Sequence, residues 1–115
     1  MKVLIVDDSD LLQSRLKKSI LEMDNSIHIE QAFSCKQAEE LFSSFIPCKV
    51  ILDIALPDGS GIDLLKKFKR ENPTSIQIML TNFPTSEFRN RCLELGADHF
   101  FDKSNLIGLL KVIAN

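Results

Sequence analysis

The stretch KVILDIALPDGSGIDLL, residues 49–65, decides the fold more than any other part of the chain. It opens with an apolar run at 49–52, reaches an acid at Asp53, turns through a segment rich in proline and glycine, and takes up helical spacing from residue 61. A continuous apolar run is typical of a strand that is buried on both faces of a parallel sheet. Such strands are joined by crossover helices. The stretch therefore predicts a strand, a turn and a helix, with an acid at the carboxyl end of the strand.

Four more runs of strand type surround this stretch. They are residues 2–6, 27–33, 76–80 and 99–101. The run at 27–33 alternates apolar and polar residues, as an edge strand does, whereas the others are dense. Segments with a repeat of about 3.6 residues follow each run. These helices are expected at residues 10–23, 35–46, 61–71, 85–95 and 104–114.

The regular alternation of strands and helices predicts an α/β fold. Short connections favour parallel pairing through right-handed crossovers. Five such units suit a flavodoxin-like (βα)5 fold, a doubly wound parallel five-stranded sheet with strand order 2-1-3-4-5. No linker or repeat interrupts the pattern, so residues 1–115 are expected to form one domain.

Composition excludes several classes of function. The chain has 14 Lys and Arg against 16 Asp and Glu, so no global basic field would hold nucleic acid. No apolar stretch reaches the roughly 18 residues of a membrane span, and the N-terminus becomes acidic at Asp7, too early for a secretory signal. We expect a cytoplasmic protein without a membrane partner. Three widely spaced cysteines argue against a zinc site and against a disulfide framework, and Cys35 and Cys92 are expected in the core.

Polar side chains follow four of the predicted strands where each strand ends. Asp7 and Asp8 follow the first, Asp53 the third, Thr81 the fourth and Lys103 the fifth. The functional crevice of an open parallel sheet lies beyond the carboxyl ends of its strands, so these side chains are expected to converge. A hard divalent cation with oxygen ligands relieves the repulsion among three carboxylates, and Mg²⁺ fits best. A carboxylate beside such an ion and a lysine can attack phosphorus to form an aspartyl phosphate.

Each of these residues also has a purely structural interpretation. Asp7 or Asp8 can cap the following helix, Asp53 can open a turn, Thr81 can cap a helix, and Lys103 can be a surface lysine. Taken singly, these interpretations are favoured. Their joint occurrence at four strand ends favours a shared site.

The chain resembles the receiver domain of bacterial two-component response regulators from KVLIVDD to the last helix. The motifs are VDD at 6–8, LDIALPDGSGIDLL at 52–65, MLTN at 79–82 and GADHFFDK at 96–103. The resemblance implies that Asp53 accepts a phosphoryl group from a sensor histidine kinase or a phosphotransfer protein. It also implies that such a chain is not an enzyme beyond its own phosphoryl transfer and dephosphorylation.

The same resemblance implies a role for each site residue. Asp8, Asp53 and the backbone carbonyl of Ala55 would bind Mg²⁺ directly, and Asp7 would act through water. The residues implied to contact the phosphoryl group are Thr81 and Lys103. Thr81 and Phe100 would form the switch, with Phe100 turning inward as Thr81 moves.

The sequence departs from the family pattern beside the site. Ser104 follows the lysine where the family usually has proline, so this loop is expected to take another path, with Ser104 as a candidate cap of the last helix. Asn82 and Phe83 follow the threonine, where a small residue is common. Both affect how easily a phosphoryl group and water reach the site.

The last helix has more apolar residues than one core face needs. Ile107 and Val112 lie to either side of the main apolar stripe at 100° per residue. The helix at 85–95, the strand at 99–101 and the helix at 104–114 are therefore expected to form a face that pairs with a second copy or an output partner. No output domain is expected within the chain.

Two other functions remain open. Residues 8–12, DSDLL, approximate the motif of haloacid dehalogenase phosphatases, although the chain lacks the expected downstream acid pair and room for a cap. The second alternative is a receiver-shaped interaction module that is never phosphorylated, which Asn82 and Ser104 keep open.

Overall fold

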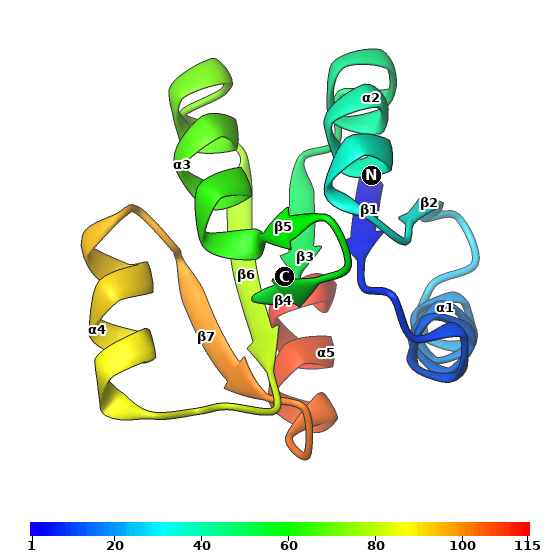
Figure 1. Cartoon of the computed structure of the whole chain (residues 1–115). Coiled ribbons are helices and arrows are strands. Elements are labelled where there is room, and N and C mark those ends of the chain that lie inside the picture. Colours follow the sequence, from blue (N-terminus) through cyan, green and yellow to red (C-terminus); the bar gives the residue numbers. More distant parts are fainter.

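Five parallel strands form the central sheet of the computed structural model, which describes all 115 residues. Across the sheet the strands are β2 (His28–Ala32), β1 (Lys2–Val6), β3 (Lys49–Leu52), β6 (Ile76–Thr81) and β7 (His99–Asp102). Because β6 and β7 are the fourth and fifth strands of this sheet along the chain, the predicted order 2-1-3-4-5 is confirmed (Figure 1). The edge position predicted for residues 27–33 is confirmed as well, since β2 pairs only with β1.

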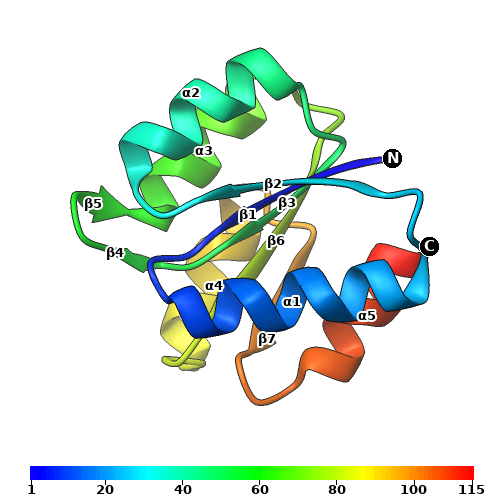
Figure 2. The same ribbon diagram turned by 90° about the vertical axis from the view of Figure 1, so that its right-hand side faces the viewer.

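Helices cover both faces of this sheet (Figure 2). One face is covered by α1 (Asp10–Met23) and α5 (Leu106–Ala114). The other is covered by α2 (Cys35–Phe45), α3 (Gly61–Glu71) and α4 (Ser86–Glu94). Successive side chains of a strand point to opposite faces, so Leu4 lies in one core cluster and Ile5 in the other. Dense apolar strands are needed because both faces are buried.

Each helix begins at a side chain that accepts a backbone N–H of the first turn. The caps are Ser9, Ser34, Ser60, Thr85 and Asn105. The expectation that Ser104 caps the last helix is wrong, because the Asn105 side chain accepts from Gly108 N at 3.1 Å. Ser104 N instead donates to Asp102 Oδ1 at 3.0 Å. The turn between β7 and α5 is thus closed by an acid and an amide, with a trans bond after Lys103.

A short hairpin lies between β3 and α3, where the sequence indicated only a turn. Its strands are β4 (Ala55–Leu56) and β5 (Gly59–Ser60), which pair antiparallel. The hairpin closes at its base, where Gly61 N donates to Ile54 O at 2.7 Å. A Cβ on Gly61 would lie 1.8 Å from the carbonyl oxygen of Asp53. Only glycine can bring the start of α3 this close to the backbone of Asp53.

The remaining expectations about the core are met except at one position. Cys92 is buried and Cys35 packs against the same core cluster, as predicted. Val112 is partly buried against the cluster under α1 and α5, so the expectation that it stands outside the core is wrong, whereas Ile107 is 72% exposed. None of the helices is long and apolar enough to cross a membrane.

Candidate functional site

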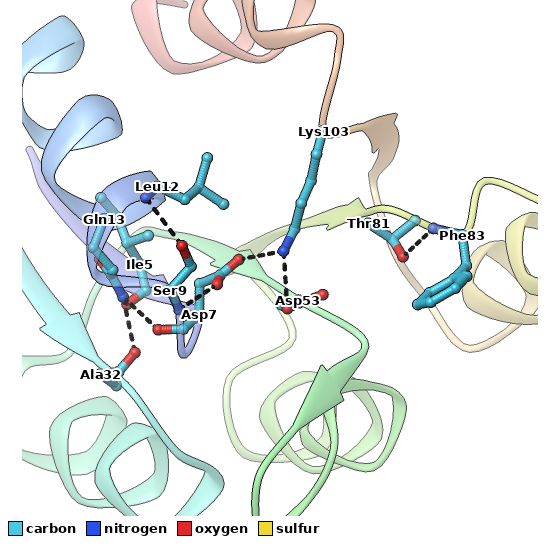
Figure 3. Close-up of polar contacts among 10 residues, drawn as sticks. All are labelled: Ile5, Asp7, Ser9, Leu12, Gln13, Ala32, Asp53, Thr81, Phe83 and Lys103. Atoms are coloured by element: carbon cyan, nitrogen blue, oxygen red, sulfur yellow. Dashed lines mark hydrogen bonds and ion pairs between the residues drawn. The ribbon is translucent and has the colours of Figure 1, made fainter.

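The ammonium group of Lys103 holds together acids from two different strands (Figure 3). Asp7 follows β1, Asp53 follows β3, and Lys103 follows β7. Lys103 Nζ lies 2.8 Å from Asp7 Oδ2 and 3.0 Å from Asp53 Oδ2. The predicted convergence of these three residues is therefore found in the structure. Parallel strands make it possible, because all their carboxyl ends lie at one edge of the sheet.

Burial and charge act against each other at this site. Burial is the largest influence on Asp53 and raises its pKa, and the neighbouring Asp7 adds to the increase, while Lys103 works against it. Burial would lower the pKa of Lys103, but its contacts with Asp7 and Asp53 outweigh this and raise that pKa. The lysine thus stays charged and supplies the positive charge that two buried carboxylates need.

The adjacent acids Asp7 and Asp8 have different surroundings. Asp7 is 2% exposed, and its Oδ1 accepts from Ser9 N at 2.8 Å while its Oδ2 contacts Lys103. Asp8 is exposed and has no protein hydrogen-bond partner or ion pair through its side chain. Both oxygens of Asp7 are therefore engaged by the protein, whereas those of Asp8 are free to take another partner.

The donor set fits a hard divalent cation. Carboxylate oxygens of Asp7, Asp8 and Asp53 all lie within 4.8 Å of one another. The cluster contains no imidazole or thiol, and oxygen ligands alone suit Mg²⁺ rather than zinc. The resemblance also implies the carbonyl of Ala55 as a ligand, and Ala55 lies two residues beyond Asp53 as the exposed first residue of β4.

Two of the expected site residues do not contact the acids. Thr81 is fully buried, and its hydroxyl accepts from Phe83 N at 3.0 Å, away from Lys103 and Asp53 (Figure 3). Phe100 is 8% exposed and packs in a core cluster, with the Arg89 guanidinium 6.0 Å from its ring centre. The ring is already inside, so the expectation that it starts outside and turns inward does not describe this conformation.

The sequence interpretation overlooked one polar residue, Gln13. It is 1% exposed, and its amide nitrogen donates to the carbonyl oxygens of Ile5, Asp7 and Ala32 at 2.9–3.1 Å. This amide fixes the backbone that presents Asp7 and Asp8. A signal was available, because Gln13 shares the buried stripe of α1 with Leu16 and Ile20, where a polar side chain is unexpected.

The arrangement places a buried carboxylate beside a fixed positive charge. Asp53 offers a carboxylate at the end of a buried strand, and Lys103 is placed to meet negative charge that arrives beside it. A fixed ammonium and a cation held by acids are the elements that stabilise a transferring phosphoryl group.

The chain is similar to known signalling proteins. A family model described as the response regulator receiver domain matches residues 3–114. The transcriptional regulatory protein PhoP of Escherichia coli K12 is 33% identical over 90% of this chain and 45% of its own length. A cyclic di-GMP phosphodiesterase of Thermotoga maritima is 30% identical over 97% of this chain and 29% of its own length. The chain thus spans less than half the length of both relatives.

Solved structures agree with this similarity. The non-phosphorylated HemR receiver domain from Leptospira biflexa is 33% identical, with a TM-score of 0.86 over 99% of this chain and 94% of that one. The signal receiver domain of a DNA-binding response regulator from Colwellia psychrerythraea has a TM-score of 0.92 at 25% identity, over 98% of this chain and 94% of that one.

Proposed function

The chain belongs to the family of response regulator receiver domains, and from this premise we propose that it accepts a phosphoryl group on Asp53. The donor would be a phosphohistidine of a sensor histidine kinase or of a phosphotransfer protein. Receiver domains are signalling modules rather than classical enzymes, so this chain would promote only its own phosphoryl transfer and dephosphorylation. The observation that supports this most strongly is the Lys103 ammonium held between Asp7 and Asp53.

The transfer can be written from the residues of the site. A carboxylate oxygen of Asp53 attacks phosphorus, the bond between phosphorus and the histidine nitrogen breaks, and its electron pair stays on that nitrogen. Lys103 turns from the carboxylate to an oxygen of the new phosphoryl group. Thr81 reaches the same group only if its hydroxyl turns away from Phe83, which would move the segment between β6 and α4.

Receiver domains bind Mg²⁺ at an acidic pocket, and we assign this role here to Asp8, Asp53 and the carbonyl of Ala55. When bound, the ion would neutralise charge that builds up on the phosphoryl oxygens. Asp7 would act through water, since its two oxygens already accept from Ser9 N and Lys103.

We expect stoichiometric labelling of the protein, with no more than one phosphoryl group per chain. Purified protein is mixed with a phosphohistidine protein or a small acyl phosphate, with and without Mg²⁺, and its intact mass is measured. The phosphatase alternative is examined with a generic phosphomonoester. Multiple turnovers of that ester without labelling would contradict the proposal. Asp10, the second acid of the phosphatase-like motif, lies outside the acidic cluster, which argues against that alternative.

Asp8→Ala should weaken Mg²⁺ binding more than Asp7→Ala, because the oxygens of Asp8 are free while those of Asp7 are engaged. Second-sphere changes at metal sites commonly cost about 10-fold or more in affinity, and loss of a direct ligand should exceed this. Isothermal titration calorimetry measures both, since the chain has no tryptophan to report binding. The reverse order would mean that the two roles are exchanged.

Receiver domains of response regulators interact with kinases and output domains. We propose that α4, β7 and α5 form the face through which this chain pairs with a second copy or an output partner, more strongly after phosphorylation. Exposed apolar side chains on α4 and α5 support the proposal. They are Phe88, Leu93 and Ile107. Nucleic acid would be reached only through such a partner.

Ile107→Lys should reduce association through this face without unfolding the protein, because the side chain is 72% exposed. Sedimentation velocity with and without beryllofluoride compares the variant with the wild type. Val112→Lys is unsuitable here, since Val112 packs against the core. If the wild type is monomeric in both states, self-association through this face is ruled out and a different partner is required.

A further inference from the structure

Asp58 joins the hairpin beside the phosphoacceptor to a helix far away in the sequence. Its Oδ1 accepts from Cys35 N at 2.7 Å and its Oδ2 accepts from Lys36 N at 3.1 Å. Both donors are backbone groups in the first turn of α2. We propose that Asp58 is a positioning residue that couples the Mg²⁺ site at Asp53 and Ala55 to the N-terminus of α2. This inference rests on the proposed function, because it assigns regulation of the same site.

Besides the packing of Leu56 against a core cluster, the hairpin that contains Asp58 is held at its base and at its tip. At its base, Gly61 N donates to Ile54 O at 2.7 Å and α3 begins. At its tip, the two bonds of Asp58 hold it to α2, and Gly59 approaches Cys35 so closely that a Cβ on it would lie 3.1 Å from the sulfur. Between base and tip lies Ala55, in the two-residue strand β4. The position of the Ala55 carbonyl therefore depends on both anchors.

The charged form of Asp58 makes this contact. Its bonds from the backbone N–H of Cys35 and of Lys36 lower the pKa of Asp58. A carboxylate is also favoured at a helix N-terminus, where unpaired N–H groups and the helix dipole offer positive charge. α2 already has its own cap, because Ser34 Oγ accepts from Gln37 N at 3.2 Å. Asp58 is therefore not required simply to start α2, and its two bonds mainly fix the hairpin.

The coupling should act in both directions. We call the two bonds from Cys35 N and Lys36 N to Asp58 the clamp. If the clamp places the Ala55 carbonyl for the ion, then breaking these bonds weakens Mg²⁺ binding. By thermodynamic linkage, bound Mg²⁺ then strengthens the clamp and holds the first turn of α2 more firmly. Asp58 also lines an open groove of about 400 Å³ between α2 and α3, so the clamp is accessible from outside. The surface at the start of α2 would thus sense the state of the acidic site, separately from the face formed by α4, β7 and α5.

The test compares Mg²⁺ affinity, measured by calorimetry, among four forms of the full chain. Asp58→Ala should bind Mg²⁺ about tenfold more weakly than wild type, at the low end for outer-sphere groups because Asp58 is exposed. Ser34→Ala loosens the first turn of α2 but leaves both bonds of Asp58 in place, so it should weaken Mg²⁺ binding less than Asp58→Ala does. Asp63→Asn removes an exposed negative charge from the same groove and should leave affinity unchanged.

Amide hydrogen exchange gives a second measurement. In wild type, Mg²⁺ should slow exchange at the amides of Cys35 and Lys36, and in Asp58→Ala it should not. Equal weakening of Mg²⁺ binding by Ser34→Ala would assign the effect to fraying of α2, and equal weakening by Asp63→Asn would assign it to charge. Either result overturns the coupling. If wild type and Asp58→Ala bind Mg²⁺ equally well, the coupling is overturned but the proposed function is not. If wild type does not bind Mg²⁺, the proposed function is overturned as well.

Discussion

Asp53→Asn is expected to reduce phosphoryl labelling to the background of the assay. The amide of asparagine is a poor nucleophile for phosphorus. No other carboxylate in the site both contacts Lys103 and keeps one oxygen free to attack. Asp7 is the other acid in contact with Lys103, but its Oδ1 is held by Ser9 N. Labelling is measured by intact mass after incubation with a phosphohistidine protein or an acyl phosphate and Mg²⁺.

The loss should not reflect unfolding. Burial raises the pKa of Asp53, so its ionised form is less stable in the folded protein than in the unfolded chain. This unfavourable contribution is absent at low pH, develops as pH rises through the ordinary pKa, and is complete only above the raised pKa. Asp53→Asn removes this unfavourable contribution, but it also removes the favourable ion pair with Lys103. The circular dichroism spectrum should therefore remain that of the wild type.

A matched control is available in the same region. Asp10→Asn alters an exposed acid at the start of α1, outside the acidic cluster, and should label as the wild type does. Labelling of Asp53→Asn at the wild-type level would show that another residue accepts the phosphoryl group. Retained labelling in Asp10→Asn together with loss in Asp53→Asn would support Asp53 as the acceptor.

Element bounds were predictable because burial on both faces imposes a clear pattern. Strands at 2–6 and 49–52 and helices at 10–23 and 61–71 begin and end as expected. The hairpin of β4 and β5 was not expected, since two-residue strands contain no periodicity. The start of the last helix was expected at 104 and lies at Leu106, because the side chain that accepts its first N–H is Asn105 rather than Ser104.

The site was predictable as a set of residues but not as a set of contacts. The rule that parallel strands end at one edge brings Asp7, Asp53 and Lys103 together, and the structure agrees. The direction of a buried hydroxyl or ring depends on its tertiary neighbours, which explains why Thr81 pairs with Phe83 and why Phe100 lies inside. The bonds of Asp58 to residues 22 and 23 positions earlier leave no local signal at all.

Helix propensity and the structure disagree about the effect of Gly61→Ala. Gly61 is the first residue of α3, and in a helix interior alanine is favoured over glycine by about 1 kcal/mol. From the helix alone, the substitution should therefore do no harm. In the structure, the added Cβ would lie 1.8 Å from Asp53 O and 2.8 Å from Asp53 C, and both are backbone atoms. Neither can move away as the end of a flexible side chain would.

We therefore expect Gly61→Ala to lower the free energy of unfolding by about 3 kcal/mol or more, at the upper end for overpacking, because a strand and a helix must separate. Urea denaturation followed by far-ultraviolet circular dichroism measures it, since the chain has neither tryptophan nor tyrosine. Gly59→Ala is the control, because its Cβ would meet only the Cys35 side chain, at 3.1 Å. Complete loss of a cooperative transition in Gly61→Ala alone would agree with the prediction. A Gly61→Ala protein as stable as wild type would mean that α3 can begin further from Asp53. The position of Asp53 beside Lys103 would then not depend on the close approach of Gly61.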